Sequence, residues 1–284
     1  MGTTSAIARL RGTKRRVLPG FGLSLGFTLT YLGFIVLIPL AVLFAQAAGA
    51  GGARFLSELT NPRTLAAFRV SFETAFLAAA VNVVFGLLIA WVLVRYPFPG
   101  RRFVDALIDL PFGLPTAVAG ISLTTLYSST GWIGAPLASL HIHVAFTRLG
   151  ILVALVFVGL PFVVRTVEPV LRDFDRELED AAALLGASRA HILARVILPP
   201  LVPALLTGFT LAFARAIGEY GSVIFIAGNM PGLTEILPLL IIIKLEQFDY
   251  AGATVIAALM LIASFLLLLA INLLQGWMRR RRGG

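Results

Sequence analysis

Long apolar stretches alternate with short polar segments along this chain, and several stretches have no charged residue over their whole length. A helix needs about 20 apolar residues to cross a hydrocarbon core. The pattern predicts six transmembrane helices, over residues 25–48, 74–94, 110–127, 149–164, 201–227 and 251–278. A further apolar run, 236–243, is too short to cross, and we expect an outer-face helix or a re-entrant piece packed on the bundle.

Composition supports an all-α integral membrane protein. The chain is 58% hydrophobic and 13% charged, whereas a soluble domain carries roughly 25% charged residues. The net charge of +9 comes largely from basic tails and loops between apolar stretches, a distribution that does not form the basic face of a nucleic-acid-binding domain. The sequence has no cysteine, which excludes disulfides and thiolate chemistry.

The basic residues also predict the orientation of the chain. With six spans, 17 of the 23 lysines and arginines fall in the two tails and in the loops after the second and fourth spans. Cytoplasmic segments of membrane proteins carry such an excess. We therefore expect cytoplasmic basic tails at 1–24 and 279–284 around a six-span domain at 25–278, in the cytoplasmic (inner) membrane. The first span is expected to be an anchor and not a cleaved signal.

The long loop before the fifth span has a helical pattern of its own. Leu178, Ala181, Ala182 and Leu185 recur at i, i+3, i+4 and i+7, which places them along one face of a helix. Acidic residues crowd the start of this segment, where a helix dipole favours them. The same acidic residues disfavour a position in anionic lipid headgroups. The pattern favours an apolar knob suited to a groove on a partner protein.

A bend is expected in the middle of this loop. Gly186 stands where a helix would end in a left-handed residue, and Ser188 can cap a second short helix that runs to Ile197. Pro199 and Pro200 are expected to stop that second helix.

These residues resemble a signature of ATP-binding-cassette importer permeases. The pattern is Asp180-Ala181-Ala182, then Gly186, then Val196-Ile197-Leu198-Pro199, with Asp180 and Val196 in place of the family's Glu and Ile. The resemblance implies a type I importer permease fold with a core at about 70–275. It also implies a cytoplasmic coupling helix between helices 4 and 5 that docks on an ATPase. The coupling residues by this resemblance are Asp180, Ala181, Ala182, Gly186, Leu198 and Pro199.

Further runs resemble the permeases of sulfate/thiosulfate importers, and most of all their T-type subunit. They lie at residues 16–21, 109–112, 115–120, 215–223, 234–235 and 247–250. The resemblance implies a second permease subunit (CysW-type), two copies of an ATPase subunit (CysA-type) and a periplasmic sulfate/thiosulfate-binding protein. ATP-Mg would bind the ATPase subunit, and this chain would hold no cofactor or metal. It would be no enzyme, in agreement with the lack of a phosphate-binding Gly-Lys-Ser/Thr loop.

Arg215 and Glu219 are the charged pair inside the fifth predicted span. At i, i+4 they can meet on one helix face. Three interpretations stay open at this point: an ion pair that fixes helix packing, a direct contact with a passing anion, and a gate. A molybdate/tungstate permease remains an alternative function. An ion-coupled secondary transporter with Arg215 and Glu219 as its coupling site is an alternative of another class.

Other polar residues of the spans have plainer interpretations. Asp105 and Asp109 are expected to reach toward Arg101 or Arg102, and Asn82 is expected to hydrogen-bond across helices. Pro111 and Pro115 are expected to kink the third span or to free backbone amides for an anion.

Overall fold

The computed structural model describes residues 21–282, with side chains described as far as Trp277. The basic residues predicted as the N-terminal tail up to residue 20, and residues 283–284, lie outside the described part of the chain. So do the side chains of Arg279–Arg282, although their backbone continues the last helix. All regular elements within 21–282 are helices, as predicted.

The chain divides into two compact units, residues 1–46 and 47–284. The described part of the first unit belongs to one apolar helical stretch, built from α1 (Phe21–Leu32), the π-turn η1 (Gly33–Leu37) and α2 (Ile38–Gly49), whose last three residues belong to the second unit. Its 29 residues are long enough to cross a membrane. The stretch corresponds to the first predicted span.

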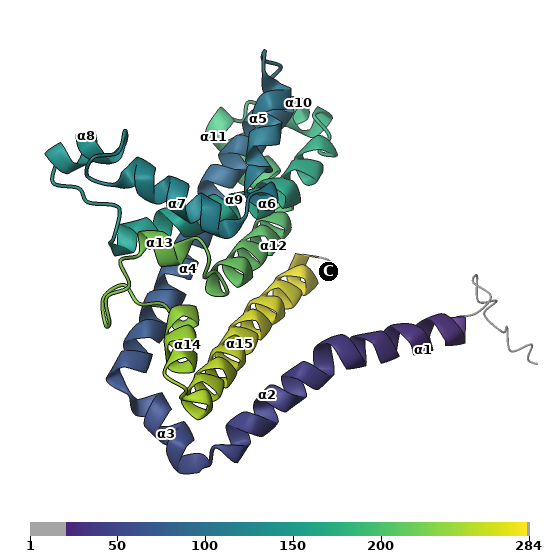
Figure 1. The fold of residues 1–284 in the computed structure, drawn as a ribbon. Coiled ribbons are helices and arrows are strands. Elements are labelled where there is room, and N and C mark those ends of the chain that lie inside the picture. Colours follow the sequence, from purple (N-terminus) through teal and green to yellow (C-terminus); the bar gives the residue numbers. More distant parts are fainter. Residues whose placement is uncertain (1–20, 283–284) are drawn as a thin grey trace, which may run out of the picture. The chain divides into compact units, whose positions relative to one another are not determined.

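Three long helices form the centre of the second unit (Figure 1): α4 (Pro62–Arg95), α9 (Arg148–Arg172) and α12 (Leu198–Ile217), each packed on the other two. They approach closely because small residues lie where they cross. A Cβ on Gly86 would lie 2.7 Å from Val163 Cγ1, and one on Gly208 would lie 2.9 Å from Val163 Cα. Val163 of α9 is thus held between two glycines, as in other membrane helix bundles.

The third predicted span is wrong as a single helix. Residues 101–127 form α5 (Arg101–Ile108), α6 (Leu110–Gly113) and α7 (Thr116–Tyr127), separated by Asp109 and by Leu114–Pro115. Pro115 precedes α7 with an extended backbone, since a proline cannot continue the hydrogen-bond ladder of the helix before it. Five helical stretches of the described chain are long and apolar enough to cross a membrane, and this segment is not among them.

Outside the connection between α9 and α12, the remaining helices are α3 (Gly52–Thr60), α8 (Gly134–Ser139), α13 (Val223–Ile226), α14 (Leu237–Glu246) and α15 (Tyr250–Arg282). The short apolar run near 236–243 is α14, which packs on α15 and α4 as the prediction of a packed piece required. The fifth predicted span ends earlier than expected, because α12 stops at Ile217 and residues 218–222 are not helical.

An ionic cluster joins α3, α14 and the start of α15. Lys244 Nζ lies 2.7 Å from Glu58 Oε1 and 2.9 Å from Asp249 Oδ2, and Arg54 bonds both carboxylates. Glu58 is only 2% exposed, so its charge depends on these partners. Asp249 also accepts a hydrogen bond from the Gly252 N–H at 3.0 Å, which caps α15.

Candidate functional site

The segment between α9 and α12 forms the bent helical pair that the sequence predicts. Its helices are α10 (Glu177–Leu184) and α11 (Arg189–Ile192). Gly186 has φ +83°, the left-handed conformation expected of it. The Ala187 N–H donates to Ala182 O at 3.1 Å and the Gly186 N–H to Ala183 O at 2.9 Å, which is the Schellman pattern of a helix C-terminus. Ser188 Oγ accepts from the His191 N–H at 3.3 Å and caps α11.

The tip of this pair is an apolar knob. Leu184 and Leu185 are each 89% exposed and Leu178 is 54% exposed. Leu184 was missing from the predicted stripe, because it lies off the i, i+3, i+4, i+7 positions. It is exposed because α10 ends at Leu184 and the chain bends away at Gly186, two residues later. Two adjacent exposed leucines are a surface that a soluble or membrane-bound partner can cover.

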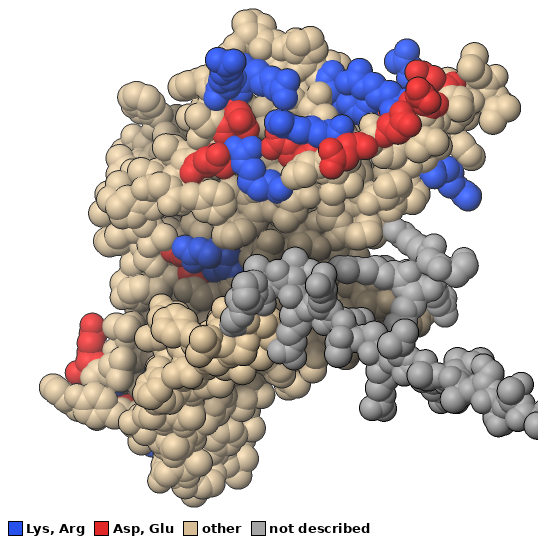
Figure 2. Space-filling model, turned by 90° about the vertical axis from the view of Figure 1, so that its right-hand side faces the viewer, with Lys and Arg blue, Asp and Glu red and all other residues tan. Residues whose placement is uncertain are grey.

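Charged residues flank the exposed leucine pair of the knob in the chain, with Glu179 and Asp180 before it and Arg189 after it. Figure 2 shows lysine, arginine, aspartate and glutamate gathered along one end of the molecule, with little charge over most of the remaining visible face. In Figure 1, α5, α10 and α11 lie together at one end of the second unit. A charged end beside an apolar body is the arrangement expected of a face that meets water at a membrane surface.

The expected stop at Pro199 and Pro200 is wrong. The helix continues from Arg189 through Ile217, with a π-helical turn, η2 (Leu193–Ile197), that ends one residue before the prolines. In the wider turn the Leu198 N–H donates to Leu193 O, and neither following proline has an N–H to donate. The extra residue in the turn accommodates a pair of prolines that would break a regular α-helix.

Arg215 and Glu219 meet, although not on one regular helix face. Arg215 lies in the last turn of α12, and Glu219 lies just beyond the helix end, where the two side chains form an ion pair. Glu219 Oε1 also accepts from the Ser222 N–H and the Ser222 Oγ–H, both at 2.9 Å. The Glu219 side chain is 2% exposed and that of Arg215 is 34% exposed. The carboxylate is therefore held inside the protein, while the guanidinium reaches a surface.

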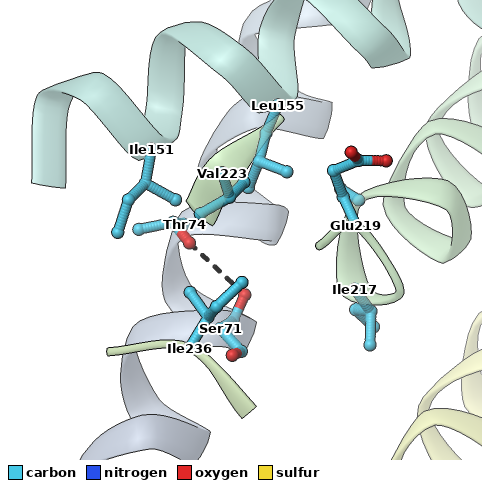
Figure 3. Close-up of a pocket in the computed structure, with 9 residues that line it drawn as sticks. Ser71, Thr74, Ile151, Leu155, Ile217, Glu219, Val223 and Ile236 are labelled. Atoms are coloured by element: carbon cyan, nitrogen blue, oxygen red, sulfur yellow. Dashed lines mark hydrogen bonds between the residues drawn. The ribbon is translucent and has the colours of Figure 1, made fainter. Parts of the chain in front are cut away.

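A small cavity borders Glu219. Figure 3 shows it among side chains of α4, α9 and α13, with Ser71 and Thr74 as its polar residues besides Glu219. Its volume is about 10 Å³, the space of a single water molecule. No tetrahedral oxyanion fits there in this conformation, so Glu219 and this cavity are not a preformed anion site.

Asp105 and Asp109 do not reach Arg101 or Arg102, and that expectation is wrong. Both bond Arg165 of α9: its Nη1 lies 2.7 Å from Asp105 Oδ1 and its Nη2 lies 2.6 Å from Asp109 Oδ2. Arg165 Nη1 also lies 2.7 Å from Glu168 Oε2. One guanidinium with five N–H donors thus ties the broken segment to α9.

Asn82 was expected to hydrogen-bond across helices and does not. Its side chain is fully buried against Gly159 of α9, where a Cβ would lie 2.5 Å from Asn82 Nδ2. Neither polar atom of the amide has a hydrogen-bond partner among the described residues. The sequence shows a polar residue in a span, but not which groups lie opposite it.

The two predicted site regions lie at opposite ends of one helix. Leu198 and Pro199 begin α12, and Arg215 lies in its last turn. Seventeen residues at 1.5 Å per residue separate Leu198 from Arg215 by about 26 Å. The structure therefore does not bring the predicted coupling residues, between Asp180 and Pro199, together with the Arg215–Glu219 pair, although α12 joins the two regions.

Comparison with known proteins places the chain in a family. Residues 82–284 match the family described as binding-protein-dependent transport system inner membrane component. A probable sulfate transport system permease protein cysT of Nephroselmis olivacea is 53% identical over 256 residues, which are 90% of each chain. The sulfate transport system permease protein CysT of Escherichia coli K12 is 51% identical over 269 residues, which are 95% of this chain and 97% of that protein.

The fold has solved counterparts. A bacterial ABC transporter involved in the import of the acidic polysaccharide alginate matches with a TM-score of 0.68, over 92% of this chain and 94% of that chain. At 17% sequence identity this likeness shows the shared fold alone. The helical permease fold expected from the signature loop is confirmed. The chain belongs to the binding-protein-dependent transport permeases and, among them, to the CysT-type permeases.

Proposed function

We propose that this chain is a permease subunit of an ATP-binding-cassette importer that carries sulfate, and also thiosulfate, across the cytoplasmic membrane. A second permease subunit completes the pore, two copies of a separate ATPase subunit hydrolyse ATP, and a periplasmic binding protein delivers the anion. The observation that carries the proposal is the identity of about half of all residues, over nearly the whole chain, with permeases named for sulfate transport. This identity favours sulfate over molybdate or tungstate as the transported anion.

The exposed α10–α11 pair supports the coupling part of the proposal. An apolar knob flanked by charged residues is suited to a groove of the ATPase subunit, with Leu184 and Leu185 as the inserted side chains. Asp180, Ala181, Ala182 and Gly186 shape the knob, and Leu198 and Pro199 begin the helix that carries its motion into the bundle. A secondary transporter would have no ATPase for such a knob to meet.

Gly186 provides the test of this coupling surface. Gly186→Val places a β-branched residue at φ +83°, where it is strained, while no neighbouring atom lies within 4 Å of a Cβ. We expect the ATPase subunit to copurify poorly with this variant and sulfate uptake to fall about tenfold or more, the effect of about 1.4 kcal/mol. Gly186→Asn is the matched control, since asparagine tolerates the left-handed region. Normal uptake by Gly186→Val would remove the coupling assignment.

Arg215 is the residue that we propose to meet the anion on its way. Its guanidinium is partly exposed, and Glu219 holds it in place from the buried side. A cation already paired with a carboxylate would bind a divalent anion weakly, which suits passage rather than storage. The transport step is then alternating access: ATP binding moves the coupling segments, and the helices reorient around the anion.

If Arg215 meets the anion, the single variants Arg215→Gln and Glu219→Gln should lose different amounts of sulfate uptake. Arg215→Gln should leave an assembled importer and reduce sulfate uptake at least tenfold, about 1.4 kcal/mol. Glu219→Gln should reduce uptake less, because a glutamine oxygen can still accept from Ser222. Sulfate uptake by the reconstituted importer is measured beside its ATPase activity. If both variants fail to assemble and the double variant recovers, the pair serves packing alone.

The substrate is tested by competition. Labelled sulfate uptake is measured in cells that express the complete importer, with unlabelled thiosulfate, molybdate or tungstate in excess. Thiosulfate is expected to compete and molybdate to compete weakly. If molybdate competes more strongly than thiosulfate, the sulfate/thiosulfate assignment is wrong. If uptake does not depend on ATP, the proposed ATP-driven mechanism is wrong.

A further inference from the structure

Arg95, the last residue of α4, makes an unusual set of contacts. Its guanidinium carbon lies 5.2 Å from the ring centroid of Trp91, one turn earlier in α4, and 5.9 Å from that of Phe174, in the connection between α9 and α10. The same guanidinium forms an ion pair with Glu179 of α10. The Arg95 side chain is 9% exposed and that of Glu179 is 24% exposed. A charge buried to this degree persists because rings and a carboxylate replace its water.

These contacts give α10 a third attachment to the bundle. Its two ends are joined through the chain to α9 and, by way of α11 and η2, to α12, and α10 packs on α11 and η2. Among the described residues, the ion pair of Arg95 and Glu179 is the one salt bridge formed by α10. It connects α10 to α4, the 34-residue helix that packs along both α9 and α12.

We propose that Arg95 is a positioning residue for transport, which makes α4 follow the movement of α10 when the ATPase subunit pushes on it. This inference rests on the proposed role of α10 in docking the ATPase. A push on α10 alone would reach α9 and α12 only through the non-helical connections at 173–176 and 185–188. The Arg95 contacts transmit it directly to α4, so that all three central helices move together.

The chemistry of arginine suits this role. A planar guanidinium can lie over two rings and at the same time direct N–H groups to a carboxylate, which a lysine ammonium cannot do. The Arg95 contacts therefore oppose a change in the angle between α10 and α4 as well as their separation. Arg172, near the same end of the bundle, differs: its side chain is 55% exposed and pairs with Glu168 within α9. Arg172 is the matched control, because its loss removes a charge without releasing α10 from α4.

The experiment measures ATP hydrolysed per sulfate transported by the complete importer reconstituted in vesicles, for wild type, Arg95→Gln, Glu179→Gln, the double variant and Arg172→Gln. We expect both single variants to retain the ATPase subunit and to raise this ratio roughly threefold or more. The double variant should be no worse than either single one, because both remove the same contact. Arg172→Gln should match the wild type.

Several outcomes would overturn the inference. An unchanged ratio in Arg95→Gln and Glu179→Gln would show that α4 follows α10 without this contact. Additive effects in the double variant would show that the two residues act separately, and loss of the ATPase subunit would show that they only shape the docking surface. A wild-type importer that takes up no sulfate would instead refute the proposed function, since no ratio could then be measured.

Discussion

Asp249 illustrates how single charged residues hold the second unit together. Burial by itself raises the pKa of this carboxyl, but hydrogen bonds from Lys244 and the Gly252 N–H, together with the charges of Lys244 and Arg54, outweigh burial and lower the pKa below its ordinary value of 3.8. A group whose pKa is lowered by folding stabilises the protein above its unfolded pKa. That stabilisation is lost as the pH falls through the folded pKa.

The lowered pKa of Asp249 predicts that the protein loses stability in acid. Thermal unfolding of the detergent-purified protein should show a loss of about 1 kcal/mol, the size of a partly exposed ion pair, as the pH falls below the ordinary value of 3.8. Asp249→Asn should be less stable at neutral pH and should lack this loss. Glu73→Gln is the control, since Glu73 pairs with Arg69 on an exposed surface, at 50% and 72% side-chain exposure. If the thermal stability of the wild type and of Asp249→Asn depended on pH in the same way, Asp249 would not be the source of the loss in acid.

At the scale of elements, the contact between α7 and α13 supports the charged pair. A Cβ on Gly120 of α7 would lie 2.4 Å from Ser222 O and 2.8 Å from Ser222 Cα. These are backbone atoms, which cannot turn aside as a side chain can. Ser222 in turn donates both its N–H and its hydroxyl to Glu219. The packing of one short helix thus positions the carboxylate that holds Arg215.

This contact predicts the effect of one added methyl group. Gly120→Ala should lower the free energy of unfolding by about 1–3 kcal/mol, the usual cost of overpacking, and should reduce sulfate uptake by shifting Ser222 and Glu219. Gly113→Ala in α6 is the matched control, because no neighbouring atom lies within 4 Å of a Cβ there. The measurements are thermal unfolding and uptake. If Gly120→Ala and Gly113→Ala had the same stability and the same uptake, α13 would shift to admit the methyl group without disturbing the Arg215–Glu219 pair.

At the scale of the whole molecule, the distribution of arginine and lysine predicts that both tails and the α10–α11 pair are cytoplasmic. The chain has no cysteine, so single introduced cysteines can report this. Ser188→Cys in the predicted cytoplasmic loop should resist a membrane-impermeant maleimide added to intact spheroplasts and should react after permeabilisation. Ser139→Cys, in the predicted outer loop, should react in both cases. The opposite labelling would reverse the topology.

Local chemistry determined what could be predicted from the sequence. Apolar length and charge distribution predicted the long helices, because crossing a hydrocarbon core depends on composition and little else. Gly186 and Ser188 predicted the bend of the α10–α11 pair, because left-handed C-termini and side-chain caps are formed by residues next to one another. The same locality made the signature from Asp180 to Pro199 readable without a structure.

Tertiary structure decided the contacts between residues far apart in the chain. Asp105 and Asp109 bond Arg165 and not Arg101 or Arg102, which are nearer in sequence, and Glu179 pairs with Arg95. Asn82 lies against Gly159 without a hydrogen-bond partner in the described part of the chain. The third span breaks and α12 ends at Ile217, because neighbouring helices can pack around interrupted backbone that isolated apolar stretches could not tolerate. Such choices depend on which groups folding brings together, and apolar periodicity along one segment contains no information about the segment that will face it.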